Sequence, residues 1–213
     1  MIVLINPNST SAMTDAMAST AAAVAPDAHV EGWTSRDGPP AIQGPEDGAA
    51  CVPPMLELVE KADREGAQAI IIGCADDTGL AEAREIANCP VIGIGQAAYH
   101  FAALCGPRFS VVTTLLVSVP VLEANIATHG LSANLVRVRA SGVPVLDLEA
   151  DKANATRRVL EEVKRAEAED DIQSIVLGCG GMTHIRDAAP PDVSVRLVDG
   201  VETAAQLAQI MTR

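Results

Sequence analysis

The sequence predicts an α/β fold made of two pseudo-symmetric units, each a parallel sheet covered by helices. Short apolar runs rich in Val and Ile alternate with helical patterns along the 213 residues, and this alternation is typical of parallel sheets. Two of the runs end in Gly-Cys, at Cys74 and at Cys179. The 105-residue spacing of these cysteines recurs between Ile70 and Ile175. We interpret the chain as a duplicated unit that presents one thiol from each half.

Length and composition are sufficient for a well-packed core. Hydrophobic residues make up 48% of the chain, with a mean hydropathy of +0.22, but aromatic residues only 2%. The core is therefore expected to consist of Ala, Val, Ile and Leu. A chain of this length can form two domains of about 100 residues each. We assign residues 1–96 plus 201–213 to an N-terminal α/β domain that carries Cys74, and residues 97–200 to a C-terminal α/β domain that carries Cys179.

The charge balance disfavours nucleic acid and anionic membrane surfaces as partners. The formal net charge is −13 and the isoelectric point is about 4.6. Phosphate binding requires clustered Lys and Arg, and base stacking requires aromatic side chains. We interpret the acidity as a solvated surface and expect a small-molecule ligand instead.

Cysteine usage and the first residues indicate a reducing compartment. Five cysteines without a Cys-x-x-Cys pair indicate neither a disulfide scaffold nor a zinc site. The chain enters an apolar strand at once, without the basic flank or the apolar length of a signal peptide. No apolar run reaches the ~18 residues that a membrane span needs. We therefore expect a cytoplasmic protein with free thiols.

Apolar runs, and the Gly and Pro residues that end them, define the elements of the first half. Asn6-Pro7-Asn8 ends the first strand, and the Ser and Thr residues at 9–11 can cap the next helix. Residues 36–45 are too rich in Gly and Pro for a regular element, and a long loop at a strand end can cover a pocket. Pro53-Pro54 predicts an interruption of the helix that contains it. The expected strands are 2–5, 29–33, 69–72 and 90–95. The first expected helix follows the cap at 9–11 and ends near 24, and the others span 46–65, 77–87 and 96–104.

The second half repeats this alternation. Residues 109–114 echo the first strand, and one side of the long helix at 151–168 is rich in Glu, Lys and Arg, as expected of a solvated face. The expected strands are 109–114, 135–138, 143–146, 172–177 and 193–198, and the expected helices are 118–129, 151–168, 182–188 and 201–211.

The two Gly-Cys turns are the main candidates for chemistry. A thiolate is the reactive form of cysteine, and its formation is favoured at a helix N-terminus. Cys74 and Cys179 both follow a strand and precede a helical pattern, and they occupy equivalent points of the repeat. A lone cysteine is usually a buried hydrophobic residue, and we assign no role to Cys51, Cys89 and Cys105.

Two thiols that face one carbon atom suit stereoinversion. One thiolate removes a proton next to a carbonyl group, and the opposite thiol returns a proton to the other face. The enolate that develops needs hydrogen-bond donors, for which the backbone N–H groups of Thr113, Thr114, Gly180 and Gly181 are candidates. Such a reaction requires no metal or organic cofactor. The hypothesis depends on both thiols lying on opposite walls of one pocket.

Several separated motifs resemble those of the aspartate/glutamate/hydantoin racemase superfamily, and within it the hydantoin and allantoin racemases. The matching segments span nearly the whole chain: Ile5-Asn6-Pro7-Asn8-Ser9-Thr10, Gly38-Pro39 with Ile42 and Gly44, Gly73-Cys74 with Asp77 and Gly79-Leu80, Gly93-Ile94-Gly95, Val111-Val112-Thr113-Thr114, and Gly178-Cys179-Gly180-Gly181-Met182.

The resemblance implies a fold, a mechanism and a set of site residues. It implies an aspartate/glutamate racemase-like pair of domains with the site between them, cofactor-independent racemisation by Cys74 and Cys179, and a homo-oligomer. The residues that the resemblance assigns to the substrate pocket are Asn8, Ile42, Gln43, Gly44, Ala75, Asp76, Thr113, Thr114, Gly180, Gly181, Met182 and Thr183.

The sequence departs from the hydantoin racemase pattern after the first cysteine. An aromatic residue usually follows that cysteine, whereas this chain has Ala75, Asp76 and Thr78 in the segment. These changes reshape the pocket and add a negative charge. His184 lies close to Cys179 in the sequence, and we interpret it as a helix-surface residue rather than a residue that tunes the thiol.

Three other functions stay open at this stage. An amino-acid racemase or a maleate-type cis–trans isomerase belongs to the same superfamily, and the isomerase uses a cysteine as nucleophile. A malonate decarboxylase is disfavoured because the resemblance implies that such enzymes use only the second cysteine. A noncatalytic small-molecule binder is the alternative from another class.

Overall fold

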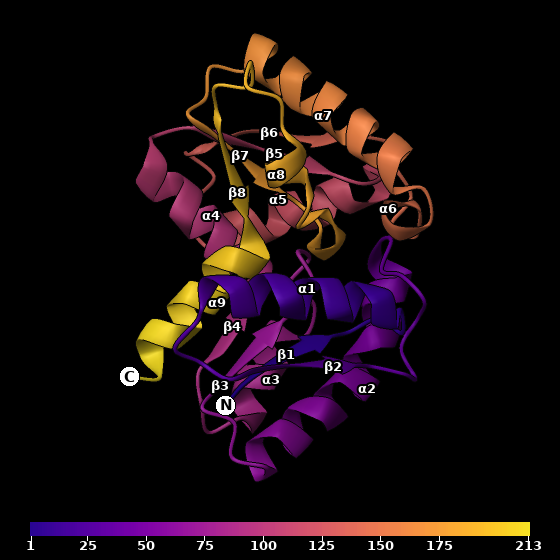
Figure 1. Cartoon of the computed structure of the whole chain (residues 1–213), viewed down its shortest axis with the longest axis vertical. Coiled ribbons are helices and arrows are strands. Elements are labelled where there is room, and N and C mark those ends of the chain that lie inside the picture. Colours follow the sequence, from indigo (N-terminus) through magenta and orange to yellow (C-terminus); the bar gives the residue numbers. More distant parts are fainter.

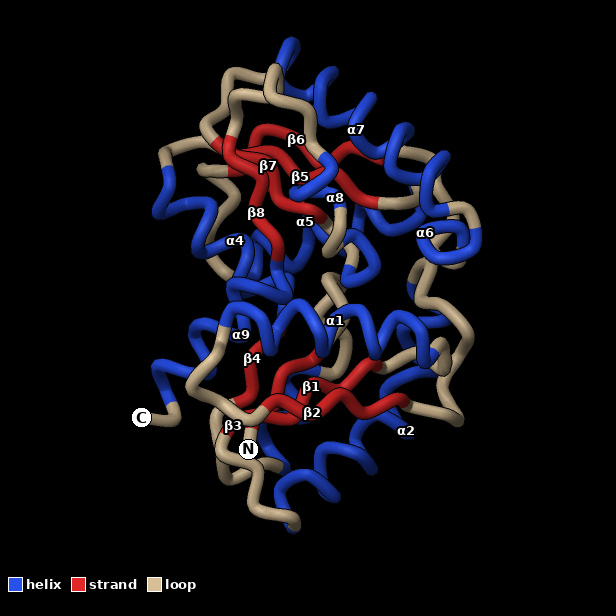
Figure 2. The backbone as a smooth tube through the Cα atoms, viewed as in Figure 1, coloured by secondary structure: helices blue, strands red, loops and turns tan.

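Eight strands form two separate four-stranded parallel sheets, one in each lobe of the molecule (Figures 1 and 2). The structure is a computed structural model that describes residues 1–213. The first sheet contains β1 (Ile2–Asn6), β2 (Val30–Thr34), β3 (Ala69–Ile72) and β4 (Val91–Gly93) in the order β2-β1-β3-β4. The second contains β5 (Phe109–Thr113), β6 (Leu135–Ala140), β7 (Ser174–Leu177) and β8 (Arg196–Asp199) in the order β6-β5-β7-β8.

The two sheets have the same topology, and this confirms the duplicated α/β fold. The third strand of one half, β3, and its counterpart β7 start 105 residues apart, like the cysteines that follow them. Every residue of β1, β3, β5 and β7 is buried. These central strands consist mainly of apolar residues because helices cover both faces of each sheet.

Nine α-helices and two short 3-10 turns connect the strands. The helices are α1 (Ser11–Val24), α2 (Pro45–Arg64), α3 (Leu80–Ile86), α4 (Ile94–Cys105), α5 (Val119–Thr128), α6 (Asp147–Ala150), α7 (Lys152–Glu169), α8 (Ile185–Ala188) and α9 (Gly200–Met211), and the turns are η1 (Leu116–Ser118) and η2 (Gly180–Met182). The charged face of α7 is solvated, as predicted, while Ala155, Val159 and Val163 point into the core.

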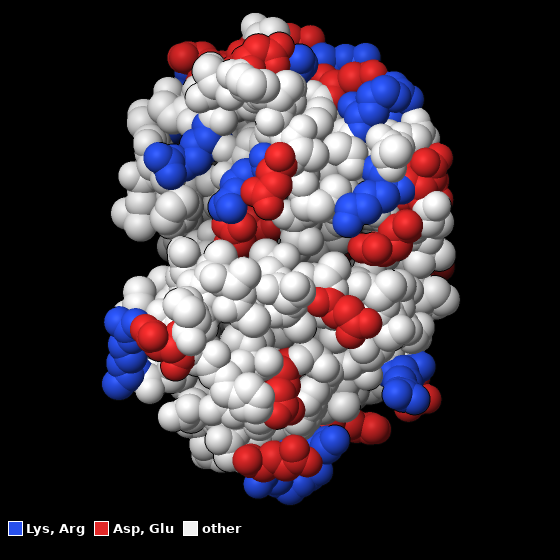
Figure 3. All heavy atoms as spheres, in the orientation of Figure 1, with Lys and Arg blue, Asp and Glu red and all other residues white.

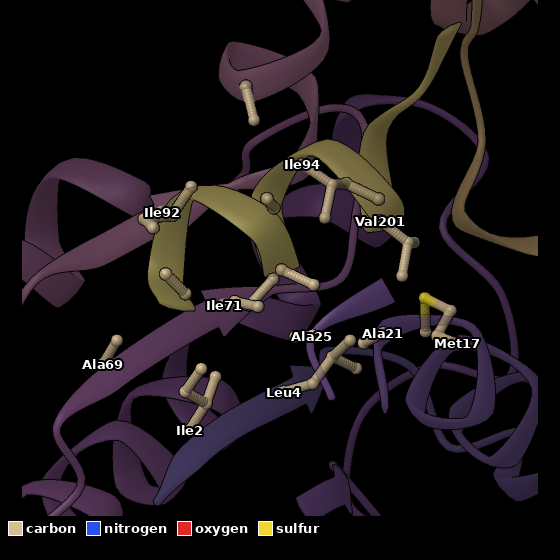
Figure 4. Packing of buried hydrophobic residues seen from close by; sticks show 14 of the residues in the cluster. Ile2, Leu4, Met17, Ala21, Ala25, Ala69, Ile71, Ile92, Ile94 and Val201 are labelled. Carbon is tan, nitrogen blue, oxygen red and sulfur yellow. The ribbon is translucent and has the colours of Figure 1, made fainter. Parts of the chain in front are cut away.

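The helices α4 and α9 each pack on the sheet of the other half. Helix α9 follows the second sheet, but its residues Val201, Ala204 and Ala208 join the core formed by β1, β3 and α1 (Figure 4). Helix α4 follows the first sheet, but Tyr99 and Ala102 join the core of the second. This exchange supports the proposed division into residues 1–96 plus 201–213 and 97–200, which stays a prediction.

Several predicted elements differ from the structure, among them the strand predicted at 193–198, which is Arg196–Asp199, and the helix predicted at 182–188, which is Ile185–Ala188. Helix α2 continues through Pro53 and Pro54, because its apolar side packs on the first sheet through Met55, Val59 and Ala62 and compensates for the lost backbone hydrogen bonds. The predicted strand 143–146 is a loop that ends in a turn. Helix α3 begins at Leu80 rather than at 77, after left-handed backbone at Gly79, and α4 begins at Ile94 rather than at 96.

The surface carries no dominant basic face in the view of Figure 3. Lys and Arg side chains lie beside Asp and Glu side chains on both lobes of this face. Ion pairs such as Arg157 with Glu161 and Lys164 with Asp192 follow the same pattern. None of the helices combines the length and the apolar composition that crossing a bilayer requires.

The contact between α4 and α9 leaves no room for a side chain at Gly200. A Cβ atom there would lie 2.5 Å from the backbone oxygen of Ile94, which cannot move independently of its helix. We expect Gly200→Ala to lower the free energy of unfolding by about 1–3 kcal/mol, as measured by urea denaturation. Gly48→Ala is the matched control, because its Cβ would meet Thr78 at 3.6 Å. An equal loss of stability in both variants would contradict this account.

Candidate active site

A small cavity lies where the carboxyl ends of the central strands of both sheets meet. Its volume is about 30 Å³. Both lobes contribute to its wall, which places it where ligands of parallel α/β folds bind. The lining residues are Asn8, Met13, Met17, Ile42, Gly73, Cys74, Ala75, Asp76, Thr113, Thr114, Ser118, Val145, Gly178, Cys179, Gly180 and Gly181.

The two Gly-Cys turns approach each other directly. Cys74 follows β3 and Cys179 follows β7, and both thiols are free. A Cβ atom on residue 180 would lie 3.0 Å from the backbone oxygen of Gly73 and 2.7 Å from Sδ of Met17. Glycine at position 180 therefore allows the backbones of the two halves to come this close without displacing Met17.

Both thiols are held in their protonated form. Burial, followed by the negative charge of Asp76, raises the pKa of Cys74 well above its ordinary value, and Cys179 contributes in the same direction. Burial also raises the pKa of Cys179 to about 12, with a further increase from Asp76. The backbone N–H groups of Asp76 and Gly181 act in the opposite direction on Cys74 and Cys179 respectively. A substrate or a further stabilising contact must lower one of these pKa values before a thiolate forms near neutral pH.

Asp76 is the only carboxyl group on the cavity wall. The residue is 8% exposed, and no donor of the protein bonds to its carboxylate. Burial, together with the charge of Asp77, raises the pKa of Asp76 from an ordinary value of 3.8 to about 7. The cavity therefore gains a negative charge as the pH rises through neutrality.

The segment that carries Cys74 is fixed by Asp77. The backbone of Asp77 is left-handed, with φ of 48°, and its carboxylate accepts hydrogen bonds from the N–H groups of Gly95 (3.0 Å) and Gln96 (2.6 Å) at the start of α4. His129 lies 3.9 Å from the same carboxylate. Tyr99 donates to the backbone oxygen of Ala75 (3.1 Å). These contacts fix the turn against the start of α4 and against Tyr99 and His129 of the other half.

An asparagine network shapes the turn after β1. The side-chain amide of the buried Asn6 donates to Oδ1 of Asn8 (3.0 Å) and to Oγ1 of Thr14 (3.0 Å), and Oδ1 of Asn8 also accepts from the N–H of Thr10 (2.9 Å). The Asn8 amide nitrogen contacts only Sδ of Met13, at 3.7 Å. The network therefore leaves an N–H₂ donor directed at the cavity.

Hydroxyl groups line the wall of the second half. Thr113 donates to the backbone oxygen of Gly178 (2.9 Å) and so links the ends of β5 and β7. The hydroxyls of the buried residues Thr114 and Ser118 bond to no group of the protein, although both residues line the cavity. They are available to a ligand.

Two loops border the cavity and contribute Ile42 and Val145 to its wall. The loop before α2, predicted to cover a pocket, places Ile42 on the wall and is tied to the first turn by hydrogen bonds from Ser9 N to Pro39 O (2.9 Å) and from Thr10 Oγ1 to Pro40 O (2.7 Å). Gln43 accepts from the N–H of Val145 (2.9 Å) in the loop before α6. Gln43 thus connects the two halves rather than lining the cavity.

The structure brings most of the sequence-predicted site residues together, and it adds others. Gln43, Gly44, Met182 and Thr183 do not line the cavity, and Met182 is fully buried in the core around α7. Met13, Met17, Ser118 and Val145 line it without having been predicted. The predicted residues on the wall are Cys74, Cys179, Asn8, Ile42, Ala75, Asp76, Thr113, Thr114, Gly180 and Gly181.

His184 and the acidic residues form no further centre at this site. His184 lies 3.0 Å from Oγ1 of Thr156 on α7 and does not line the cavity. No group of three or more His, Cys, Asp or Glu side chains is arranged to hold a metal ion.

The sequence profile of the Asp/Glu/hydantoin racemase family matches residues 2–208. A hydantoin racemase of Rhizobium meliloti is 42% identical over 211 residues, which cover 99% of this chain and 88% of that protein. The chain belongs to the Asp/Glu/hydantoin racemase family. As a member, it is an enzyme of the isomerase class.

Two solved structures of this family are similar over nearly the whole chain. The allantoin racemase of Klebsiella pneumoniae has a TM-score of 0.94 and 35% identity, and covers 98% of this chain and 86% of its own. The allantoin racemase of Pseudomonas fluorescens has a TM-score of 0.93 and 32% identity, and covers 98% of this chain and 89% of its own. The predicted fold and the predicted racemase family are confirmed.

The raised pKa of Asp76 has a consequence for stability. Between pH 4 and pH 7 the folded protein holds a proton on Asp76 that the unfolded chain releases, so ionisation destabilises the fold as the pH rises. We expect Asp76→Asn to increase the free energy of unfolding by about 1–4 kcal/mol above pH 7, and by progressively less toward pH 4. Urea denaturation at several pH values measures this difference. Asp15→Asn, on the exposed side of α1, should change little at any pH, and a pH-independent gain for Asp76→Asn would contradict the assignment.

Proposed function

We propose that the protein is a cofactor-independent racemase that inverts a carbon atom next to a carbonyl group of a hydantoin-like ring, such as a 5-substituted hydantoin or allantoin. The observation that carries the proposal is the presence of Cys74 and Cys179 on one cavity, at equivalent ends of β3 and β7. The names of the similar hydantoin and allantoin racemases support the substrate class.

The reaction is a proton exchange between carbon and two sulfur atoms. One cysteine thiolate takes the proton from C5 of the ring, so the C–H bond breaks, an S–H bond forms, and the electron pair moves into an enolate. The thiol of the other cysteine then gives its proton to the opposite face of C5. Its electron pair stays on sulfur as a thiolate. Cys74 and Cys179 have exchanged protonation states, and the reverse reaction uses them in the opposite roles.

Donors around the cavity stabilise the enolate oxygen. The amide of Asn8 and the hydroxyls of Thr114 and Ser118 lack strong partners in the protein, and their hydrogen bonds strengthen as negative charge develops. The N–H groups of Thr113, Thr114, Gly180 and Gly181 are further candidates. The N–H of Gly181 already favours the thiolate of Cys179.

The remaining expectations from the sequence stay predictions. They are a homo-oligomeric state, a cytoplasmic location and the absence of a nucleic-acid partner. An amino-acid racemase and a cis–trans isomerase remain the alternatives within the superfamily, and a covalent adduct on a cysteine, visible by intact mass, would favour the isomerase.

Removing either thiol separates the two proton-transfer steps. We expect Cys74→Ala and Cys179→Ala each to abolish inversion, with a loss of at least about 100-fold in kcat/KM, as measured by polarimetry without added cofactor. Each Cys→Ser variant should still exchange the C5 proton of one enantiomer with deuterated solvent, because one thiol remains on one face.

Cys105→Ala is the control for these variants, because Cys105 lies at the end of α4 and does not line the cavity. It should retain full activity. Equal residual inversion of both enantiomers in the two Cys→Ser variants would contradict the two-base mechanism.

The protonated resting state of the thiols predicts the pH dependence. Because the pKa values of both thiols are raised, the thiolate fraction of the free enzyme increases with pH throughout the neutral range. After subtraction of the uncatalysed rate, kcat/KM should rise steadily between pH 6 and pH 8. A plateau that already starts at pH 6 would show that a thiolate forms in the free enzyme without the substrate.

A further inference from the structure

The internal symmetry of the site breaks at one position. Asp76 and Gly181 are equivalent, since each stands two residues after the cysteine of its half and each directs its backbone N–H toward that thiol. Gly181 has no side chain, and a Cβ atom there would lie 2.9 Å from the side chain of Leu148. The first half instead places a carboxylate beside the two sulfur atoms.

The surroundings of Asp76 provide no partner for its charge. No hydrogen bond or ion pair of the protein reaches its carboxylate, and the cavity wall contains no Lys, Arg or His. The neighbouring Asp77 differs in this respect, because its carboxylate caps α4 and faces His129. The backbone oxygen of Asp76 accepts a hydrogen bond from Asn125 on α5, which fixes the main chain and leaves the carboxylate directed at the cavity.

The carboxylate of Asp76 accepts no hydrogen bond from the protein and lines the cavity, so it can accept one from a bound ligand. An unsatisfied buried charge is unfavourable, and hydrogen bonds to a charged acceptor are among the strongest in proteins. The ring of a hydantoin carries the reacting carbon between the thiols, so the group that varies among substrates is the substituent at C5.

We propose that Asp76 accepts a hydrogen bond from an N–H donor on the C5 substituent, so that the enzyme prefers hydantoins with ureido, ammonium or guanidinium substituents over those with apolar or acidic ones. This inference rests on the proposed racemase function and specifies its substrate class. Asp76 is a specificity-determining residue in this scheme, and the two cysteines remain the acid and the base.

The same contact favours the chemistry. The charge of Asp76 raises the pKa values of both Cys74 and Cys179. A donor that pairs with Asp76 offsets this charge and makes a thiolate easier to form, and an ammonium or guanidinium group does so more completely than a neutral ureido group. Substrates with a donor therefore bind and also activate the thiols, whereas an acidic substituent has the opposite effect.

The test compares four hydantoins with C5 substituents of similar length: aminoalkyl, ureido, alkyl and carboxyalkyl. We expect kcat/KM for the parent protein to follow the order of donors, then alkyl, then carboxyalkyl. In Asp76→Asn the two donor substrates should lose roughly 10- to 100-fold, while the alkyl and carboxyalkyl substrates gain, because the negative charge beside the thiols is gone. Asp76→Gly, which copies position 181, should show the same reversal.

The pH dependence separates specificity from a structural role. The preference of the parent for the aminoalkyl over the alkyl substrate should increase as the pH rises through about 7, where Asp76 ionises, and it should be flat in Asp76→Asn. Asp15→Asn is the charge-matched control on an exposed helix face and should keep the order of the parent.

Each outcome decides the proposal. A loss of kcat/KM in Asp76→Asn for the aminoalkyl substrate alone supports the proposal and shows that Asp76 pairs with a cationic substituent. A loss for the ureido substrate as well extends the proposal to neutral donors. The same substrate order in the parent and in both Asp76 variants would overturn the specificity role while leaving the racemase function intact. Failure of the parent to invert any of the four hydantoins would overturn the proposed function and this inference with it.

Discussion

The contact between the two Gly-Cys turns is the constraint on which the rest of the site depends. The backbone at Gly180 lies so close to the carbonyl of Gly73 that a Cβ atom there would be 3.0 Å from the carbonyl oxygen. This contact sets the distance between the ends of β3 and β7, and therefore places both thiols on one cavity. The lobes cannot separate or rotate at this point without opening the wall of the site.

The exchanged helices maintain this contact from a distance. Helices α4 and α9 each follow one sheet and pack on the other, and both start at a carboxylate: Asp77 caps α4, and Asp199 accepts from the N–H groups of Val201 (2.7 Å) and Glu202 (3.1 Å). Because Asp77 belongs to the turn that carries Cys74, the cap couples the position of that thiol to the packing of the two lobes. The site and the interface between the lobes are therefore one structural unit.

The sequence predicted those features that local patterns determine. The central strands are short runs rich in Val and Ile, and the repeat of Gly-Cys after two of them indicated a shared site. The prediction that Pro53-Pro54 interrupts its helix was wrong, because the packing of α2 outweighs the local cost of proline in a helix. Ser118 and Met17 were missed because a residue from a helix reaches the cavity only through the packing of that helix, which no local pattern encodes. Met182 shares a turn with Cys179, yet its side chain points into the core.

The acidic residues show why Asp76 differs from a structural carboxylate. Asp170 bonds to Arg139 (2.7 Å) and Ser110 (2.7 Å), and Asp77 caps α4, whereas Asp199 caps α9 through Oδ1 and leaves its Oδ2 buried without a partner. Arg139 lowers the pKa of Asp170, whereas burial still raises the pKa values of Asp77 and Asp199 despite their hydrogen bonds to helix N–H groups. The carboxylate of Asp76 is buried but accepts no hydrogen bond from the protein, and its negative charge opposes ionisation of Cys74 and Cys179. Ionised Asp76 therefore lowers the stability of the fold and makes a thiolate harder to form in the free enzyme. Both effects are reduced when a donor pairs with the carboxylate, and in our proposal the donor comes from the bound substrate.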